Sequence, residues 1–148
     1  MANNTKKIWG TGLIFRNFSG RETQWNEAGR RVTGVIVPAD RVDEFVNDGW
    51  NVKFYTPKSD PQAEPIYYIN AKIRYDNFPP RIYIKTPFSE PLKIEDEKDL
   101  DQLDRSEIDF VDVELNLSKK NAAYIKTMFV NTIVDDFEEK YFYGDRED

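Results

Sequence analysis

Residues 66–75 read IYYINAKIRY and carry the clearest strand pattern in the chain. Successive side chains of a β-strand point to opposite faces of a sheet. One face of this segment is apolar and is formed by Tyr67, Ile69, Ala71, Ile73 and Tyr75. The other face combines a ring with cations and is formed by Tyr68, Asn70, Lys72 and Arg74. The alternation predicts a strand with one buried side and one side facing solvent.

Further strands are predicted on both sides of this segment. Their ranges are Ile8–Phe18, Arg31–Val37, Trp50–Tyr55, Arg81–Lys85, Ile108–Leu117 and Ala122–Ile133. Residues 76–80, DNFPP, are typical of a turn, so we expect the strands on either side to form a hairpin. Asp40 is placed to cap a short helix that ends at Gly49. The acidic stretch Glu95–Asp104 predicts a short exposed helix or a loop.

Six or seven short strands with few helices are typical of a barrel or a sandwich. We favour a mainly β fold, a small OB-like Greek-key barrel with one or two short helices, over a sandwich. Residues 1–133 form this domain in our assignment, and residues 134–148 form an acidic C-terminal tail rich in aromatic residues. We expect Trp9, Trp50, Val52 and Phe54 to contribute to the core.

The composition excludes several classes of site. The 148 residues include no Cys and no His, which excludes a disulfide framework, a Ser-His-Asp triad and a Cys/His zinc site. The carboxylates between Glu95 and Asp104 form one continuous run rather than separate ligands on different elements, which makes a metal-dependent nuclease the weakest alternative. We expect no enzyme activity, no cofactor and no metal.

Neither a membrane span nor a signal peptide is visible in the sequence. No apolar run approaches the length of a membrane-spanning helix. The first ten residues, MANNTKKIWG, have no apolar centre of the signal-peptide type. We therefore expect no membrane partner and a location in the cytoplasm.

The formal net charge of −6 hides an uneven distribution of charge. Residues 89–114 carry a net charge of −8 and residues 134–148 carry −5. Residues 1–88 carry +4 and residues 115–133 carry +3. Because local charge matters more to a polyanion than the sum over the chain, the acidic total does not exclude a nucleic-acid partner.

Three predicted strands place rings beside cations on their outer faces. The best candidates for a binding face are Tyr68, Lys72, Arg74, Arg81, Tyr83 and Lys85. The next group adds Lys53 and Tyr55 from a third strand, with Arg16, Phe18, Arg21 and Trp25 from the loop region 16–31. Cations follow phosphates and rings stack on unpaired bases, so this combination favours binding of single-stranded nucleic acid. The alternative is that these are ordinary solvent-facing strand residues.

Two readings of the loop region 16–31 are open. It is either a flexible arm that closes over a DNA strand or a surface loop with Trp25 packed at the edge of the core.

Four groups of segments carry a resemblance to a known family. They are FRNFSG (15–20) with WNEAGR (25–30), DGWNVK (48–53), YDNFPPRIY (75–83), and AYIKTMFV (123–130) with FEEKY (137–141). In this order they cover most of the chain, which resembles the tailed-phage single-stranded DNA-binding proteins. The resemblance implies an OB-like fold, sequence-tolerant binding of single-stranded DNA, and a role in phage replication or recombination in the host cytoplasm.

The chain departs from the family pattern before its last strand. The family has a longer loop there, with a Trp and a Gly-Lys-Ser-Gly-like stretch, where this chain has only Leu117–Ala122. If that loop contacts DNA in relatives, this chain binds a shorter site or relies on Lys119 and Lys120.

The acidic tail leaves a second function open. Its rings, among them Phe137 and residues 141–143, suit docking to replication or recombination proteins, or competition with DNA for the basic groove. A frayed, solubilising terminus is the alternative. A protein–protein adaptor without catalysis is therefore the second hypothesis for the whole chain, and the sequence leaves homo-oligomerisation open.

Overall fold

The computed structural model describes residues 4–60, 62–75, 79–88 and 90–133. Nine strands of these residues form one sheet, accompanied by three short helices. The strands are β1 (Thr5–Thr11), β2 (Leu13–Asn17), β3 (Arg31–Ile36), β4 (Lys53–Tyr55), β5 (Ile66–Ile73), β6 (Arg81–Lys85), β7 (Leu92–Lys93), β8 (Ile108–Leu117) and β9 (Ala123–Thr132). The helices are the 3₁₀ helices η1 (Ala39–Arg41) and η2 (Glu97–Asp104) and the α-helix α1 (Val42–Asn47).

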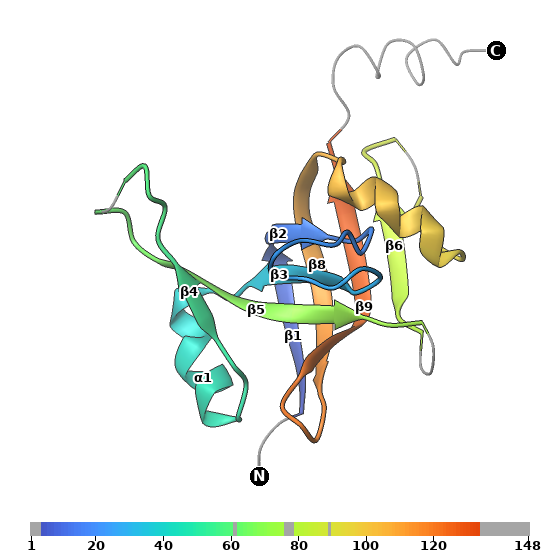
Figure 1. Ribbon diagram of the computed structural model, residues 1–148. Coiled ribbons are helices and arrows are strands. Elements are labelled where there is room, and N and C mark those ends of the chain that lie inside the picture. The colour runs from blue at the N-terminus through green and yellow to red at the C-terminus, as the bar shows by residue number, and fades with distance from the viewer. Residues whose placement is uncertain (1–3, 61, 76–78, 89, 134–148) are drawn as a thin grey trace, which may run out of the picture.

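Six of the strands follow one path, β1-β8-β9-β5-β3-β2, which curls around a single core. Off this path, β4 pairs with β5, and β6 pairs with β9 and β7. Strands β2, β3 and β5 run across the direction of β1, β8 and β9 as a second layer (Figure 1). The two ends of the path, β1 and β2, are separated along the chain only by Gly12, so the path returns to its starting point through a covalent bend. The prediction of a mainly β, OB-like fold is confirmed.

Strand β1 contains a bulge near its end, and a glycine lies in it. The register of β1 against β8 shifts between Ile8 and Thr11, which marks a bulge. Gly10 lies in this bulge with φ +61°, a left-handed conformation that glycine adopts without steric cost. The backbone N–H of Gly10 donates to Asp112 Oδ1 at 2.7 Å, which fixes the bulge against β8.

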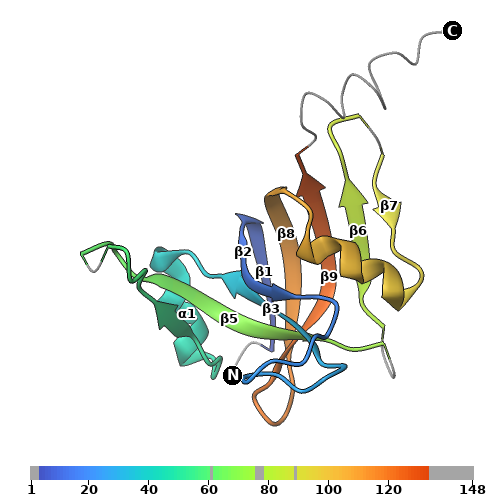
Figure 2. The same cartoon turned by 45° about the horizontal axis from the view of Figure 1, so that its top comes forward.

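The core fills the space between the two layers. Its largest fully buried side chains are Phe18, Phe45, Ile8, Ile69, Ile82, Leu100, Leu103, Leu115 and Met128. Strand β8 supplies Val111, Val113 and Leu115 to it, as the period of two requires. Strand β9 supplies Ala123, Ile125, Met128 and Val130, and its alternation shifts where the register changes between Ile125 and Thr127. Helix η2 lies against β8, β9 and β6 (Figures 1 and 2). Its buried residues Leu100 and Leu103 cover this side of the core.

The predicted hairpin between β5 and β6 does not form. Both strands pair with β9 instead, and both run parallel to it. Ala71 and Lys72 of β5 pair with the start of β9, and residues 81–85 pair with Thr127–Asn131 further along. The turn-like segment 76–80, of which residues 76–78 lie outside the described part, therefore joins two strands that point the same way.

Two of the four expected core residues lie at the surface. Trp50 is buried, and Val52 packs against the core. Trp9 is 73% exposed because it alternates with the buried Lys6 and Ile8 of β1, and Phe54 is 70% exposed on the short strand β4. Within the described residues, no helix is long and apolar enough to cross a membrane.

Candidate nucleic-acid interface

The outer side of β5 and its neighbours forms the first candidate surface, which we call the β5 face. It is defined by Phe15, Lys53, Tyr55, Tyr68, Asn70, Lys72 and Tyr124. The register brings these residues together, since Lys53 lies opposite Tyr68 and Lys72 lies opposite Tyr124. The buried partners on the inner side are Ile69, Ala71 and Ile73, so the predicted alternation of residues 66–73 is confirmed.

Three rings form a cluster at one end of the β5 face. Phe15 meets Tyr55 edge-on with ring centroids 5.2 Å apart, and it meets Tyr68 at 5.4 Å. Phe15 is 54% exposed, so the cluster presents ring surface to solvent. Sequence reasoning missed Phe15, because its φ of +51° interrupts the alternation of β2.

A glycine beneath the cluster allows Tyr68 to lie close to the sheet. A Cβ atom at Gly34 would lie 2.9 Å from the carbonyl oxygen of Ile14 and 3.3 Å from the ring of Tyr68. Any larger residue would therefore push the ring away or distort β2. The glycine in β3 thus keeps Tyr68 in contact with the strand surface.

Cations continue the β5 face toward the other end of β5. Lys72 Nζ lies 5.9 Å from the ring centroid of Tyr124, within the range of a cation–π contact. Beyond Lys72 lies a hollow of about 240 Å³ lined by Gly29, Arg30, Arg31, Val32, Lys72, Ile73 and Arg74. Arg30 and Arg74 are exposed there. The hollow is a concentration of positive charge that suits a phosphate.

Arg31, which also lines the hollow, is held in place by the protein. Its guanidinium pairs with Asp101 at 2.7 Å and with Glu97 at 3.2 Å, and it donates to the carbonyl oxygen of Phe18. Burial raises the pKa of the neighbouring Tyr75, and the Glu97 carboxylate raises it further. The acidic helix η2 thus holds Arg31 in place, which is a structural use of the acidic run.

The loop of residues 18–30 is braced by its own hydrogen bonds. The side-chain nitrogen of Asn26 donates to the carbonyl oxygens of Arg21, Glu27 and Arg30. The N–H of Gly29 donates to the carbonyl of Gly20 at 2.8 Å. These bonds give the loop a defined structure from which Arg21 and Trp25 project.

Trp25 lies on this loop and is 86% exposed. It is not packed at the edge of the core, which was the second reading of the loop.

Asp104 attaches this loop to η2. Its carboxylate accepts hydrogen bonds from the N–H groups of Phe18 and Ser19 at 2.6 and 3.1 Å, and from Ser19 Oγ at 2.6 Å. Arg21 approaches the same carboxylate at 3.8 Å but keeps a side chain 66% exposed. Arg21 therefore stays available to a ligand.

Two expected contact residues have structural positions instead. Phe18 is fully buried in the core, so its ring is not available to a base. Arg16 is half-buried and donates to the carbonyl oxygens of Leu103 and Ser106 at 2.8 and 2.7 Å. Both residues hold the loop and η2 onto the barrel.

The predicted residues on β6 lie on the other layer of the barrel. Arg81, Tyr83 and Lys85 lie opposite Thr127, Phe129 and Asn131 of β9, facing outward while Ile82 enters the core. The rings of Tyr83 and Phe129 are stacked, with centroids 4.6 Å apart and planes 8° from parallel. The structure therefore divides the expected site between two surfaces instead of uniting it in one.

The chemistry of the β5 face is that of non-covalent binding. Exposed rings, amide groups and cations can stack on bases and contact phosphates. Within the described residues, no group of three or more acidic side chains is placed to hold a metal ion. The expected tail, residues 134–148, lies outside the described residues.

The comparisons with known proteins give one match. A family model described as "Putative phage ssDNA-binding domain" matches residues 3–144, nearly the whole chain. No curated protein and no solved structure matches the chain.

Proposed function

Since the chain belongs to the phage ssDNA-binding domain family, we propose that its β5 face is the surface on which single-stranded DNA lies. Membership in the family supports single-stranded DNA binding in general. The observation that carries the proposal is the line of exposed rings and cations from Phe15 and Tyr55 through Tyr68 and Lys72 to the basic hollow.

The position of this surface supports the proposal. In OB-folds, oligonucleotides bind on the face of the second and third strands, flanked by the loops at its two ends. Here β3 and β5 form the face, the loop 18–30 lies at the end with the hollow, and the short loop 118–122 precedes β9. Lys119 and Lys120 in that loop are exposed and add positive charge.

The proposed mode of binding is tolerant of sequence. Bases stack on Tyr55, Tyr68 and Tyr124, and each stacked base contributes roughly 1–3 kcal/mol. Lys53, Lys72 and the hollow contact phosphates, which releases counterions and makes the affinity depend on salt. Trp25 and Arg21 contact the strand from the loop. All bases have a π-face, so no base is required at a given position.

The protein in this account binds DNA and does no chemistry on it. It coats single strands during phage replication or recombination in the host cytoplasm. The second hypothesis, a protein–protein adaptor, depends largely on residues 134–148, which lie outside the described residues, so it stays an untested alternative.

A double variant tests the proposed surface. Tyr68→Ala with Lys72→Ala removes one ring and one cation from the β5 face, while Phe54→Ala with Lys98→Ala removes an exposed ring and an exposed cation elsewhere. Affinity for a fluorescent oligo-dT is measured by anisotropy, and folding is checked by circular dichroism. We expect the first variant to bind at least tenfold more weakly and the second to bind as the wild type does. Equal affinities of the two folded variants would contradict the proposal.

A further inference from the structure

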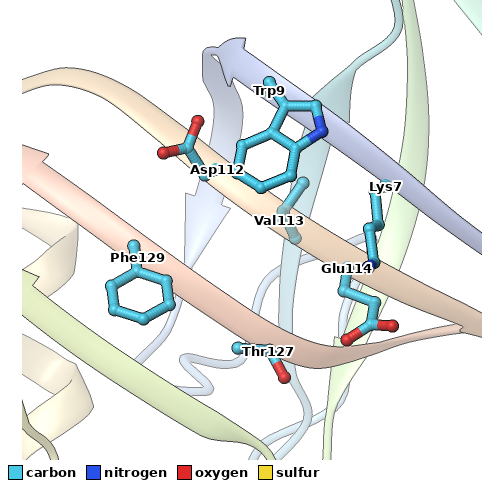
Figure 3. A pocket seen from close by; sticks show the side chains of 7 residues that line it. All are labelled: Lys7, Trp9, Asp112, Val113, Glu114, Thr127 and Phe129. Atoms are coloured by element: carbon cyan, nitrogen blue, oxygen red, sulfur yellow. The ribbon is translucent and has the colours of Figure 1, made fainter.

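A second surface with rings and cations lies on the other layer of the barrel, and we call it the β9 face. It is defined by Lys7, Trp9, Arg81, Tyr83, Lys126 and Phe129. Trp9 is 73% exposed and Phe129 is 36% exposed. Figure 3 shows Trp9 of β1 and Phe129 of β9 on the two sides of a hollow of about 190 Å³, with the β8 residues Asp112 and Glu114 beside them.

The exposure of Trp9 follows from its position in β1, where the buried Lys6 and Ile8 alternate with the exposed Lys7 and Trp9. The bulge in β1 places both Trp9 and Gly10 between two buried residues, Ile8 and Thr11. The hydrogen bond from Gly10 N–H to Asp112 fixes this arrangement. An indole held out in this way is available for stacking without any rearrangement of the sheet.

The charge of the β9 face suits a polyanion in spite of its carboxylates. Asp112 is engaged by Gly10, and Glu114 lies 3.8 Å from Lys126 and opposite Lys7 in the ladder. The outward cations of this layer are Lys7, Arg81, Lys85, Lys93 and Lys126, and the outward carboxylates are Asp109, Asp112 and Glu114. Cations are therefore in excess, and each carboxylate at the hollow has a partner.

Strand β9 joins the two faces. Its first outward ring, Tyr124, belongs to the β5 face through Lys72. Lys126 is exposed two residues later, and Phe129 follows on the outer side. At about 3.3 Å per residue, Tyr124 and Phe129 are separated by about 16 Å of strand. A ring, a cation and a second ring thus follow one another along one strand.

We propose that single-stranded DNA leaving the β5 face continues along β9 and stacks on Trp9 and Phe129. This inference rests on the proposed function and extends it. The phosphates of the continuing strand contact Lys126, Arg81 and Lys7. The barrel then binds one strand on two walls, and its footprint is longer than the β5 face alone provides.

The test compares oligonucleotides of two lengths. Oligo-dT of about 5 and about 15 nucleotides fall near the two ends of the range of site sizes for one OB-fold. Anisotropy titrations use the wild type, Trp9→Ala, Arg81→Ala, and Phe54→Ala as a control with an exposed ring outside both faces. Circular dichroism and thermal unfolding confirm that each variant is folded, which the exposure of Trp9 and Arg81 favours.

A length-dependent loss supports the inference. We expect Trp9→Ala and Arg81→Ala to weaken binding of the longer oligonucleotide by at least about 5-fold more than binding of the shorter one, the factor for the loss of one weakly stacked base. Provided that the wild type binds both oligonucleotides, the inference is overturned if the substitutions weaken binding of both lengths equally or weaken neither. Failure of the wild type to bind either oligonucleotide overturns the proposed function as well.

Discussion

The side-chain nitrogen of Lys72 lies 5.9 Å from the centre of the Tyr124 ring, and this contact joins the edges of β5 and β9. The two strands run parallel here, with Ala71 opposite Ala123 on the buried side. A cation of one strand is therefore beside a ring of another. The pairing of ring and cation that the sequence predicts within single strands is also made across strands.

Lys72→Ala should reduce the salt dependence of DNA binding. Each phosphate contact to a single strand contributes about 0.7–1 unit to the slope of log K against log salt. We expect the slope to fall by about this amount when Lys72 is removed. Anisotropy titrations at four or more salt concentrations measure the slope. Lys98→Ala removes an exposed cation of η2 that belongs neither to the β5 face nor to the lining of the hollow, and it should leave the slope unchanged.

Tyr55→Ala should weaken binding by roughly 1–3 kcal/mol, the contribution of one base stacked on a ring. Tyr55 lies in the ring cluster with Phe15, and Tyr55→Phe keeps that ring and should keep most of the affinity. Phe54→Ala removes the exposed ring of the adjacent residue, which points to the other side of β4. If Phe54→Ala bound DNA as weakly as Tyr55→Ala does, the loss of affinity would come from a disturbed strand β4 and not from the loss of stacking on Tyr55.

The alternation of residues 66–73 was sufficient to predict which side chains of β5 face outward, because a strand with a clear period of two has one buried and one exposed side. Partners of that strand were harder to predict. The Pro-Pro turn at residues 79 and 80 suggests a hairpin, yet β6 pairs with β9, which lies far away in sequence. Parallel pairing over such a separation depends on the tertiary fold and leaves no local signal.

Asp104→Ala should destabilise the fold. The Asp104 carboxylate accepts three hydrogen bonds from Phe18 and Ser19 and is only 9% exposed. Hydrogen bonds to a charged group contribute about 1.5–3 kcal/mol each, and removal of the acceptor leaves two backbone donors without it. We therefore expect the free energy of unfolding in urea to fall by at least about 1.5 kcal/mol. Ser19→Ala removes one of the three bonds and should cost less; an equal cost would show that the backbone bonds to Asp104 contribute nothing.

The stability of the protein should fall in acid through Glu44. Hydrogen bonds from Arg41 and from the buried Lys6 lower the pKa of Glu44 from 4.5 to about 2. A carboxyl with a lower pKa in the folded state stabilises the fold above its unfolded value and loses this effect as the pH falls through the folded value. The contribution should therefore be complete above pH 4.5 and disappear toward pH 2.

Urea denaturation of the wild type and of Glu44→Gln between pH 7 and about 2 checks this dependence. The difference in unfolding free energy between the two proteins should shrink as the pH falls. Asp43→Asn changes the neighbouring exposed carboxyl and serves as the control. A difference that stays constant over the whole range would contradict the assigned role of Glu44.

The candidate site was only partly predictable, and the reasons are visible in single residues. Tyr68 and Lys72 followed from alternation, whereas Phe15 depends on a positive φ that breaks it. Trp9 obeys the alternation of β1, but the inner face there includes a buried lysine, Lys6, which hides the pattern. Phe18 was expected to contact DNA because it is an aromatic residue in a basic loop. Its backbone is held by Asp104 and Arg31, and its ring fills the core.

The central claim is that this protein binds single-stranded DNA through phosphate contacts and base stacking. The most direct test is fluorescence anisotropy of a labelled oligo-dT, titrated with the wild-type protein at two salt concentrations, with unlabelled duplex of equal length as competitor. The account predicts binding that weakens as salt rises and that the duplex does not displace. Absence of binding at the lower salt concentration, or displacement by duplex as efficient as by single-stranded oligo-dT, would contradict it.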